Sequence, residues 1–111
     1  MDVLDPVTGG ILIRAVEAKG PFARARGLKG EIEPAPSSGM IFRTKQVHTM
    51  GMRFAIDAIY VAADGRVIKV VTLPPNRIGP LVLRAKWVLE TAAGEARRLG
   101  IAKSGKLVLG A

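Results

Sequence analysis

The sequence predicts a mainly β protein with minor α structure: a compact, mostly antiparallel rolled sheet or barrel-like single domain with one or two short helices. Its 111 residues match one small domain, and 49% apolar residues are enough for one core. Short runs rich in β-branched residues alternate with turns that contain glycine or proline, as in small antiparallel folds. No internal repeat, heptad pattern or low-complexity tract is present. We therefore expect residues 1–111 to form a single domain.

Two strands are expected in the first part of the chain. Residues 10–18 (GILIRAVEA) combine β-branched residues with alternating charged ones, which indicates a strand that a Gly-Pro pair ends. Residues 22–28 suit a short helical turn, and residues 31–38 (EIEPAPSS) read as a loop interrupted by prolines. Residues 39–42 (GMIF) indicate a brief apolar strand.

The middle of the chain predicts a β-hairpin followed by a rigid loop. Residues 54–62 (FAIDAIYVA) and 66–73 (RVIKVVTL) are β-rich runs joined by Asp64-Gly65, a frequent turn pair. Residues 74–80 (PPNRIGP) contain three prolines. Because proline fixes φ and has no backbone donor, this segment is expected to be a loop.

The last part of the chain predicts two further strands and one helical turn. Residues 85–92 (AKWVLETA) and 106–109 (KLVL) are the strands, and residues 94–99 (GEARRL) suit a single helical turn that ends at Gly100. Side chains alternate between the two faces of a strand, so one face of the central strands is expected to point inward. The expected core positions on that face are Ile56, Ala58, Tyr60, Val67, Val71, Trp87 and Leu89.

Composition limits the possible functions. The chain has no cysteine, which excludes disulfides, thiolate metal sites and thiol chemistry and fits a reducing compartment. The N-terminus shows no export signal, and no window approaches the ~18 consecutive apolar residues of a membrane span. We therefore expect a cytoplasmic protein without membrane contact.

The positive charge suggests nucleic acid as one possible partner. The net charge is +8 and the pI is about 10.7, and Lys and Arg bind nucleic acids by neutralising phosphates. However, the basic residues are spread from Arg14 to Lys106, and few aromatic residues are present for base stacking. A solubilising surface charge is the favoured interpretation.

Residues 47–57 (VHTMGMRFAID) contain the main candidate site. His48 is the only histidine and can donate, accept or act as a base, Thr49 has a hydroxyl, and Arg53 has a fork of donors that suits carboxylates and phosphates. Asp57 lies in an apolar strand, where a buried carboxylate needs a partner, and Glu90 is expected nearby on another strand. These residues are expected either to bind a small anionic ligand or to form a structural network of Asp57, Arg53 and Glu90.

Other kinds of site have less support in the sequence. A metal site needs three or four converging ligands, and one histidine with Asp57 and Glu90 supplies at most three from distant segments. No nucleophile elbow or phosphate-binding loop is present, and the methionines follow no copper-binding pattern. No metal or cofactor is therefore expected. A small enzyme with His48 as general base, oriented by Asp57 or Glu90, is one alternative.

Several segments, taken in order, resemble the domain-of-unknown-function 192 family. They are RARGLKG, SSGMIF, the hairpin with Asp57, the proline-rich loop, and WVLETAAG with GEARRLGI after it, and together they span about residues 11–109. Residues 47–52 differ from the aromatic-Trp-Met-Lys-Asn-Thr run of most members, so the chain resembles a His-Thr-x-Gly-Met-Arg-Phe variant. The resemblance implies a small β-rich domain with little helix. It implies no reaction, because the family's activity is not established.

Together these observations predict a small cytoplasmic binding or accessory domain, with catalysis less favoured. The expected ligand is a small anion held by Arg53 and His48 beside Asp57. The alternatives are a small enzyme that uses His48 and a protein that binds nucleic acid nonspecifically through its charge.

Overall fold

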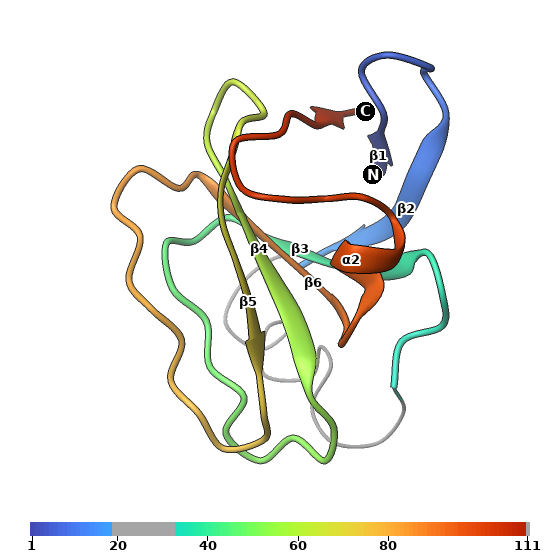
Figure 1. Ribbon diagram of the computed structural model, residues 1–111. Helices are drawn as coiled ribbons and strands as arrows, with labels where there is room; N and C mark the ends of the chain where they lie inside the picture. Colours follow the sequence, from blue (N-terminus) through green and yellow to red (C-terminus); the bar gives the residue numbers. More distant parts are fainter. Residues whose placement is uncertain (19–32, 111) are drawn as a thin grey trace.

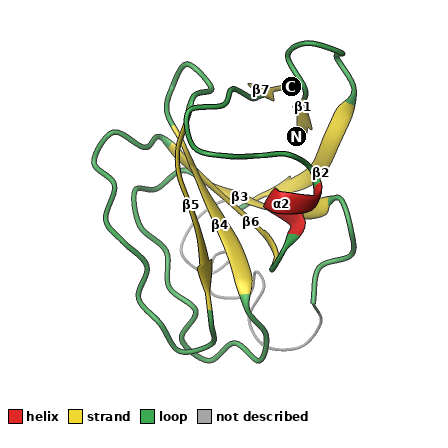
Figure 2. Cartoon of the chain, in the orientation of Figure 1, coloured by secondary structure: helices red, strands yellow, loops and turns green. Residues whose placement is uncertain are grey.

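The structure is a computed structural model that describes residues 1–18 and 33–110, and within these ranges it is mainly β with one short helix (Figures 1 and 2). The predicted fold class is confirmed, since the chain forms a compact single domain around a strongly curled sheet. The elements in chain order are β1 (Asp2–Leu4), β2 (Ile11–Glu17), β3 (Ser38–Phe42), β4 (Ile56–Val61), β5 (Val67–Leu73), β6 (Trp87–Ala92), α2 (Glu95–Arg98) and β7 (Val108–Leu109).

The strands of the described ranges form one sheet in the order β5-β4-β6-β3-β2-β1-β7. Neighbouring strands are antiparallel except β2 and β3, which are parallel. The sheet curls so far that the segment before β7 reaches β5 at the opposite end of the strand order (Figure 1). There the Ser104 N–H donates to the Val67 carbonyl and the Val67 N–H donates to the Gly105 carbonyl, both at 2.8 Å.

The strands β2 to β7 correspond to the six strands predicted from the sequence, and their ends agree to within about two residues. In the hairpin of β4 and β5, the predicted glycine turn is present: Gly65 has φ +91° and the Ala62 N–H donates to the Arg66 carbonyl at 2.9 Å. The helical turn predicted at 94–99 is α2. The helical turn predicted at 22–28 lies outside the described residues. β1 was not predicted.

The core formed by the described residues has two parts, one on each face of β4, and every residue of β4 is buried. The prediction of one inward face is therefore wrong. Ile56, Ala58 and Tyr60 belong to one cluster, whereas Val67 and Leu89 belong to the other. The cause is coverage on both sides: the loops at 43–55 and 74–86 cover one face, and β1, α2 and residues 101–107 cover the other.

Candidate functional site

The central sheet separates the acidic residues of the predicted site. In the ladder between β4 and β6, Asp57 lies opposite Thr91 and Ala58 lies opposite Glu90. Residues that lie opposite each other in such a ladder share a face, and successive residues point to opposite faces. Asp57 and Glu90 therefore point to opposite sides of the sheet. The predicted network of Asp57, Arg53 and Glu90 is not formed.

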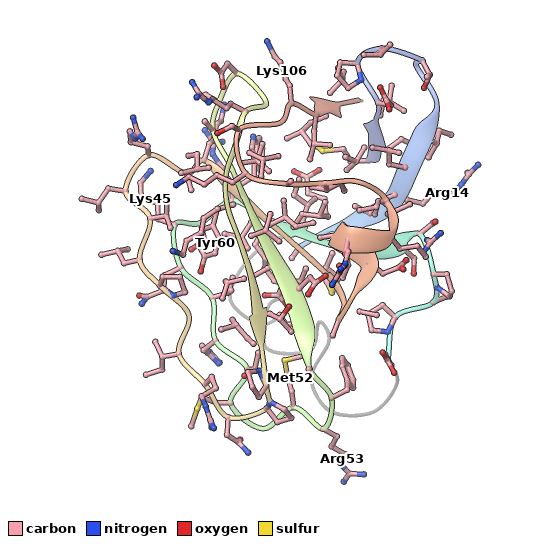
Figure 3. All side chains as sticks on the ribbon, in the orientation of Figure 1. Arg14, Lys45, Met52, Arg53, Tyr60 and Lys106 are labelled. Atoms are coloured by element: carbon pink, nitrogen blue, oxygen red, sulfur yellow. The ribbon has the colours of Figure 1, made fainter. Side chains whose placement is uncertain are left out.

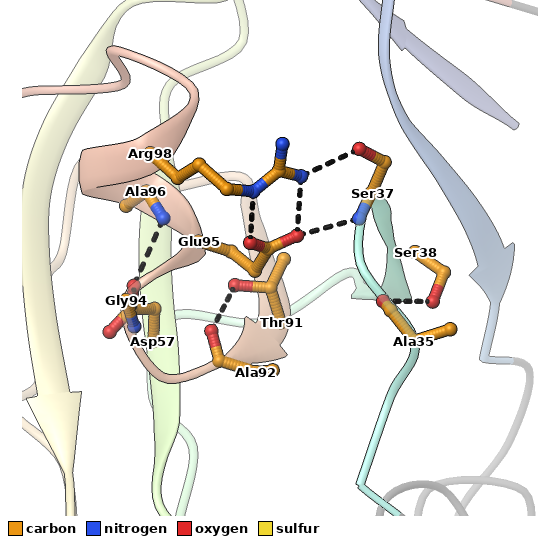
Figure 4. Close-up of polar contacts among 10 residues, drawn as sticks. All are labelled: Ala35, Ser37, Ser38, Asp57, Thr91, Ala92, Gly94, Glu95, Ala96 and Arg98. Atoms are coloured by element: carbon orange, nitrogen blue, oxygen red, sulfur yellow. Dashed lines mark hydrogen bonds and ion pairs between the residues drawn. The ribbon is translucent and has the colours of Figure 1, made fainter.

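Asp57 is buried, with 2% of its surface exposed, and bonds to β5 and to the start of α2. Its Oδ1 accepts the Thr72 hydroxyl at 2.7 Å. Its Oδ2 accepts the backbone N–H groups of Gly94 and Ala96, both at 3.0 Å, and Figure 4 shows Asp57 beside these two residues. The first N–H groups of a helix have no partner within the helix, and Gly94 at the N-cap has no side chain to supply one. Asp57 in β4 thus caps the start of α2.

Glu90 is buried on the other face of the sheet, close to Tyr60. Tyr60 is fully buried and its hydroxyl donates to the Pro80 carbonyl at 2.8 Å. Burial raises the pKa of Tyr60 above its usual value, and the charge of Glu90 raises it further, whereas a hydrogen bond from the Val47 backbone acts in the opposite direction. Tyr60 therefore joins the sheet to the loop at 74–86 as a neutral donor near neutral pH.

Thr49 is fully buried and connects the loops at 43–55 and 74–86. Its hydroxyl donates to the Pro74 carbonyl at 2.6 Å and accepts the Arg77 N–H at 2.9 Å. Its backbone carbonyl accepts the Asn76 N–H at 2.9 Å. Because these internal bonds use the hydroxyl as donor and acceptor, Thr49 holds the loops together in this structure and does not present its hydroxyl to a ligand.

His48 and Arg53 are exposed. The His48 Nδ1 accepts the Met50 N–H at 3.2 Å, so the neutral ring carries its proton on Nε2. Figure 3 shows Arg53 pointing away from the protein at the end of its loop. Asp57 cannot orient the His48 ring. The Asp57 carboxylate lies on the α2 face of the sheet, where it bonds to Thr72 of β5 and to the start of α2.

A second buried acidic residue, on the α2 side of the sheet like Asp57, was not predicted from the sequence. The buried Glu95 forms an ion pair with Arg98, with 2.6 Å between Arg98 Nε and Glu95 Oε2, and its Oε1 accepts the Ser37 N–H at 2.6 Å (Figure 4). These bonds lower the pKa of Glu95 from 4.5 to about 2, and the bond from Arg98 is the largest cause. The group fastens α2 to the turn before β3. Its only signal in the sequence is the i, i+3 spacing of Glu95 and Arg98.

An open groove of about 890 Å³ runs along β5. We call it the β5 groove; it is lined by residues 68–70 and Thr72 of β5, by Val82, and by residues of α2 and the segment 100–103 that follows it. Among the described residues, three cations border it, Lys69, Arg97 and Lys103, and all three are exposed. Asp57 also lines it, but both of its carboxylate oxygens accept internal hydrogen bonds. The β5 groove therefore presents mainly positive charge.

A second basic area surrounds Trp87, which is half-buried. The guanidinium of Arg43 lies 5.7 Å from the centroid of the indole ring, and the ammonium of Lys86 lies 5.3 Å from it. Both distances are within the range of a cation–π contact. Lys45 donates to the nearby Ala85 carbonyl at 2.7 Å. We call Arg43, Lys45, Lys86 and Trp87 the Trp87 patch.

Two absences hold for the residues that the structure describes. Among them, no three His, Asp or Glu side chains converge so that they could hold a metal ion. In the same ranges, no helix is long and apolar enough to cross a membrane.

The fold and the β5 groove define a small curled-sheet domain with a basic groove at one edge. The chain belongs to the DUF192 family, described as "Uncharacterized ACR", whose model matches residues 7–109. This confirms the family predicted from the sequence. A search of curated proteins finds no relative.

Two solved structures are similar to this chain. One is a protein of unknown function from Novosphingobium aromaticivorans, with 25% identity, a TM-score of 0.76, and coverage of 96% of this chain and 91% of that one. The other is a Sinorhizobium meliloti protein described as a "putative transcription regulator", with 24% identity, a TM-score of 0.76, and coverage of 96% and 89%. The second likeness shows the fold alone.

Proposed function

We propose that this protein is a binding domain whose ligand is anionic and occupies the β5 groove. The observation that supports this proposal is the charge of the groove: Lys69, Arg97 and Lys103 border it, while its carboxylate, Asp57, is internally bonded. Exposed cations around a concave surface attract anions and can bond directly to carboxylate or phosphate oxygens. The volume of the groove suits a small molecule or a short peptide.

The distribution of charge in the sequence also supports an anionic ligand. From residue 65 to the end, the acidic side chains are Glu90 and Glu95, and both are buried. The same part of the chain supplies Arg66, Lys69, Arg77, Arg84, Lys86, Arg97, Arg98, Lys103 and Lys106. Because the acids are used inside the protein, the surface of this part is more basic than the net charge alone suggests.

The proposal is tested by thermal-shift and native mass-spectrometry measurements with citrate, inorganic phosphate and short acidic peptides. The double variant Arg97→Ala/Lys103→Ala removes two charges from the β5 groove. The matched control, Arg14→Ala/Lys106→Ala, removes two exposed charges that lie elsewhere (Figure 3). We expect at least roughly tenfold weaker binding in the groove variant and little change in the control, since each charged hydrogen bond contributes about 1.5–3 kcal/mol. Equal binding by both variants would contradict the proposal.

The site predicted at His48 and Arg53 is a separate proposal for the same class of ligand. Both side chains are exposed on one loop, but the buried Thr49, Asp57 and Glu90 do not join them at a common surface. The variant Arg53→Ala distinguishes the two sites. If Arg53→Ala removes anion binding while Arg97→Ala/Lys103→Ala does not, the ligand binds at the 43–55 loop.

Nucleic acid is a second candidate ligand, supported by the Trp87 patch. Its cations could neutralise phosphates, and the half-buried indole could contact a base if the cations moved from the ring. Trp87 is the only tryptophan, so its fluorescence reports on this area alone. A decrease in fluorescence on adding single-stranded DNA or RNA, with affinity that falls steeply as salt rises, would support this candidate.

Two finer expectations from the sequence belong with these proposals. The absence of cysteine is consistent with a cytoplasmic protein, and cell fractionation would test this. We also propose that the chain represents a His-Thr-x-Gly-Met-Arg-Phe variant of the family. The bonds of Thr49 between the two loops support this proposal, because they give the threonine a structural role. Relatives with this run should keep the bond between the two loops.

A further inference from the structure

Among the described strands, β5 is one end of the sheet order and pairs with β4 alone. The Lys86 N–H donates to the Val61 carbonyl, so the backbone groups of Val61 point toward β6. Backbone groups alternate in direction along a strand, so those of Tyr60 and Ala58 point toward β5, where they meet Lys69 and Val71. The N–H and C=O groups of Val70 and Thr72 therefore point away from β4, toward the open edge.

This open edge lines the β5 groove. Val70 and Thr72 are lining residues, and among the described residues no backbone group bonds to their outer N–H and C=O groups. One position of the same edge is already paired: Val67 exchanges two hydrogen bonds with Ser104 and Gly105. The edge is thus bonded at Val67 by the turn at 103–105, and among the described residues Val70 and Thr72 have no such backbone partner.

We propose that an extended acidic segment of another protein adds to β5 as a further strand, along the β5 groove. This inference rests on the proposed function of the groove and names the class of its ligand. An exposed strand edge supplies main-chain hydrogen bonds to such a segment, and the groove walls select its side chains. At about 3.3 Å per residue, the edge from Ile68 to Thr72 matches a segment of roughly five residues.

The positions of the cations specify the segment further. Lys69 lies opposite Tyr60 in the ladder and shares its face, whereas Arg97 and Lys103 belong to the chain that covers the other face. The cations therefore flank the edge on both sides. Successive side chains of an extended segment also point to opposite sides, so two consecutive acidic residues can reach cations on both.

The charges also argue against a second copy of this chain as the occupant. Pairing of β5 with β5 of another copy would bring two sets of Lys69, Arg97 and Lys103 together. Like charges that face each other across such an interface are unfavourable. A lysine on an edge strand is also a common protection against pairing between copies. An acidic segment removes this repulsion.

The test compares four probes by NMR titration of the labelled full chain: the peptide TVDEVDEVT, the same peptide with N-methyl groups on alternate backbone nitrogens, the basic peptide TVKKVKKVT, and citrate. We expect TVDEVDEVT to shift the signals of residues 68–72 and to slow hydrogen exchange of the Val70 and Thr72 amides by at least about tenfold. The N-methyl and basic peptides should bind at least roughly tenfold more weakly, because one lacks donors and the other has the wrong charge.

The outcomes separate this inference from the proposed function. If citrate and both acidic peptides bind the groove equally and the two amides are not protected, the groove binds anions but strand addition is wrong. If no anion binds at the groove, both proposals fail. Formation of a dimer through β5, seen by size-exclusion chromatography, would replace the acidic segment with a second copy and overturn the inference.

A variant gives an independent test on the protein side. Val70→Pro removes the outward N–H together with the partly buried Val70 side chain, which packs against the core. The matched control Val70→Ala removes the same packing and keeps the N–H, and proline is tolerated on edge strands where that group faces solvent. We expect Val70→Pro, but not Val70→Ala, to weaken TVDEVDEVT at least roughly tenfold and leave citrate binding unchanged. Unchanged binding of TVDEVDEVT would contradict strand addition. If Val70→Pro does not fold, the test is hydrogen exchange of the Val70 and Thr72 amides in the unaltered chain: protection by TVDEVDEVT supports strand addition, and its absence contradicts it.

Discussion

The Asp57 carboxylate in β4 accepts the backbone N–H of Ala96 in α2 at 3.0 Å, across 39 positions of sequence. The same oxygen accepts the Gly94 N–H, so one buried side chain satisfies two of the free donors at the start of α2. This bond fixes the position of α2 over the sheet. It therefore also fixes the wall of the β5 groove that carries Arg97.

Replacing Asp57 should destabilise the protein strongly. In Asp57→Ala, the N–H groups of Gly94 and Ala96 and the Thr72 hydroxyl lose their acceptor, and we expect a loss of about 2–4 kcal/mol in the free energy of unfolding, measured by denaturant titration. Asp57→Asn retains one acceptor oxygen and should lose less. The exposed Asp64→Ala is the control, although its Oδ1 accepts the Arg66 N–H in the turn. A loss below about 1 kcal/mol in Asp57→Ala would contradict its role as a cap.

The ion pair of Glu95 predicts a dependence of stability on acid pH. The pKa of Glu95 is about 2 in the folded protein and 4.5 without its partners. A group whose folded pKa is depressed contributes stability above its unfolded pKa, and this contribution is lost as the pH falls from about 4.5 to about 2. Glu95→Gln should therefore be less stable at pH 7, and its stability should fall less over this pH range. The exposed Glu33→Gln should retain the original profile.

The packing of Gly79 predicts that a single methyl group is destabilising. A Cβ at this buried position would lie 2.9 Å from the Tyr60 hydroxyl and 2.9 Å from the Val47 carbonyl oxygen. The carbonyl is backbone and cannot move without shifting the 43–55 loop, so Gly79→Ala should cost about 1–3 kcal/mol. Gly10→Ala is the matched control, because Gly10 is exposed and its Cβ would meet only the Thr8 hydroxyl, at 3.2 Å. Thermal melts of the two variants should differ clearly.

Local sequence signals were sufficient for the strands β2 to β7, but not for β1 or for the site. The hairpin of β4 and β5 was predictable because its turn, Asp64-Gly65, lies between two β-rich runs. β1 has three residues and is stabilised by pairing with β2 and β7, a pairing between the two ends of the chain that no local pattern indicates. The partners of Asp57 were missed for a related reason: they are backbone N–H groups of a distant turn, and backbone groups have no sequence signature.

The predicted core face failed for a different reason. Alternation along β4 predicts one inward face, which holds for a sheet covered on one side. Here the sheet curls and both faces are covered, so Ile59 and Val61 are as buried as Ile56 and Tyr60. Whether a loop such as 74–86 covers a face depends on contacts like that between Tyr60 and Pro80, which form only in the folded chain.

The position of Trp87 gives a quantitative test of this correction. A fully buried tryptophan usually costs about 3–5 kcal/mol when changed to alanine, and a core position for Trp87 predicts a loss of this size. In the structure Trp87 is half-buried and packs against one of the two core clusters, while Arg43 and Lys86 lie over its ring. We therefore expect Trp87→Ala to lower the free energy of unfolding by about 2–3 kcal/mol in denaturant titrations. Per unit of buried apolar area removed, this loss should be smaller than that of Leu89→Ala.

The variant Trp87→Phe should recover most of this loss, because it keeps an aromatic ring for Arg43 and Lys86, whose cation–π contacts contribute about 0.5–1 kcal/mol. A loss above about 4 kcal/mol in Trp87→Ala would contradict this prediction and indicate that Trp87 is fully buried.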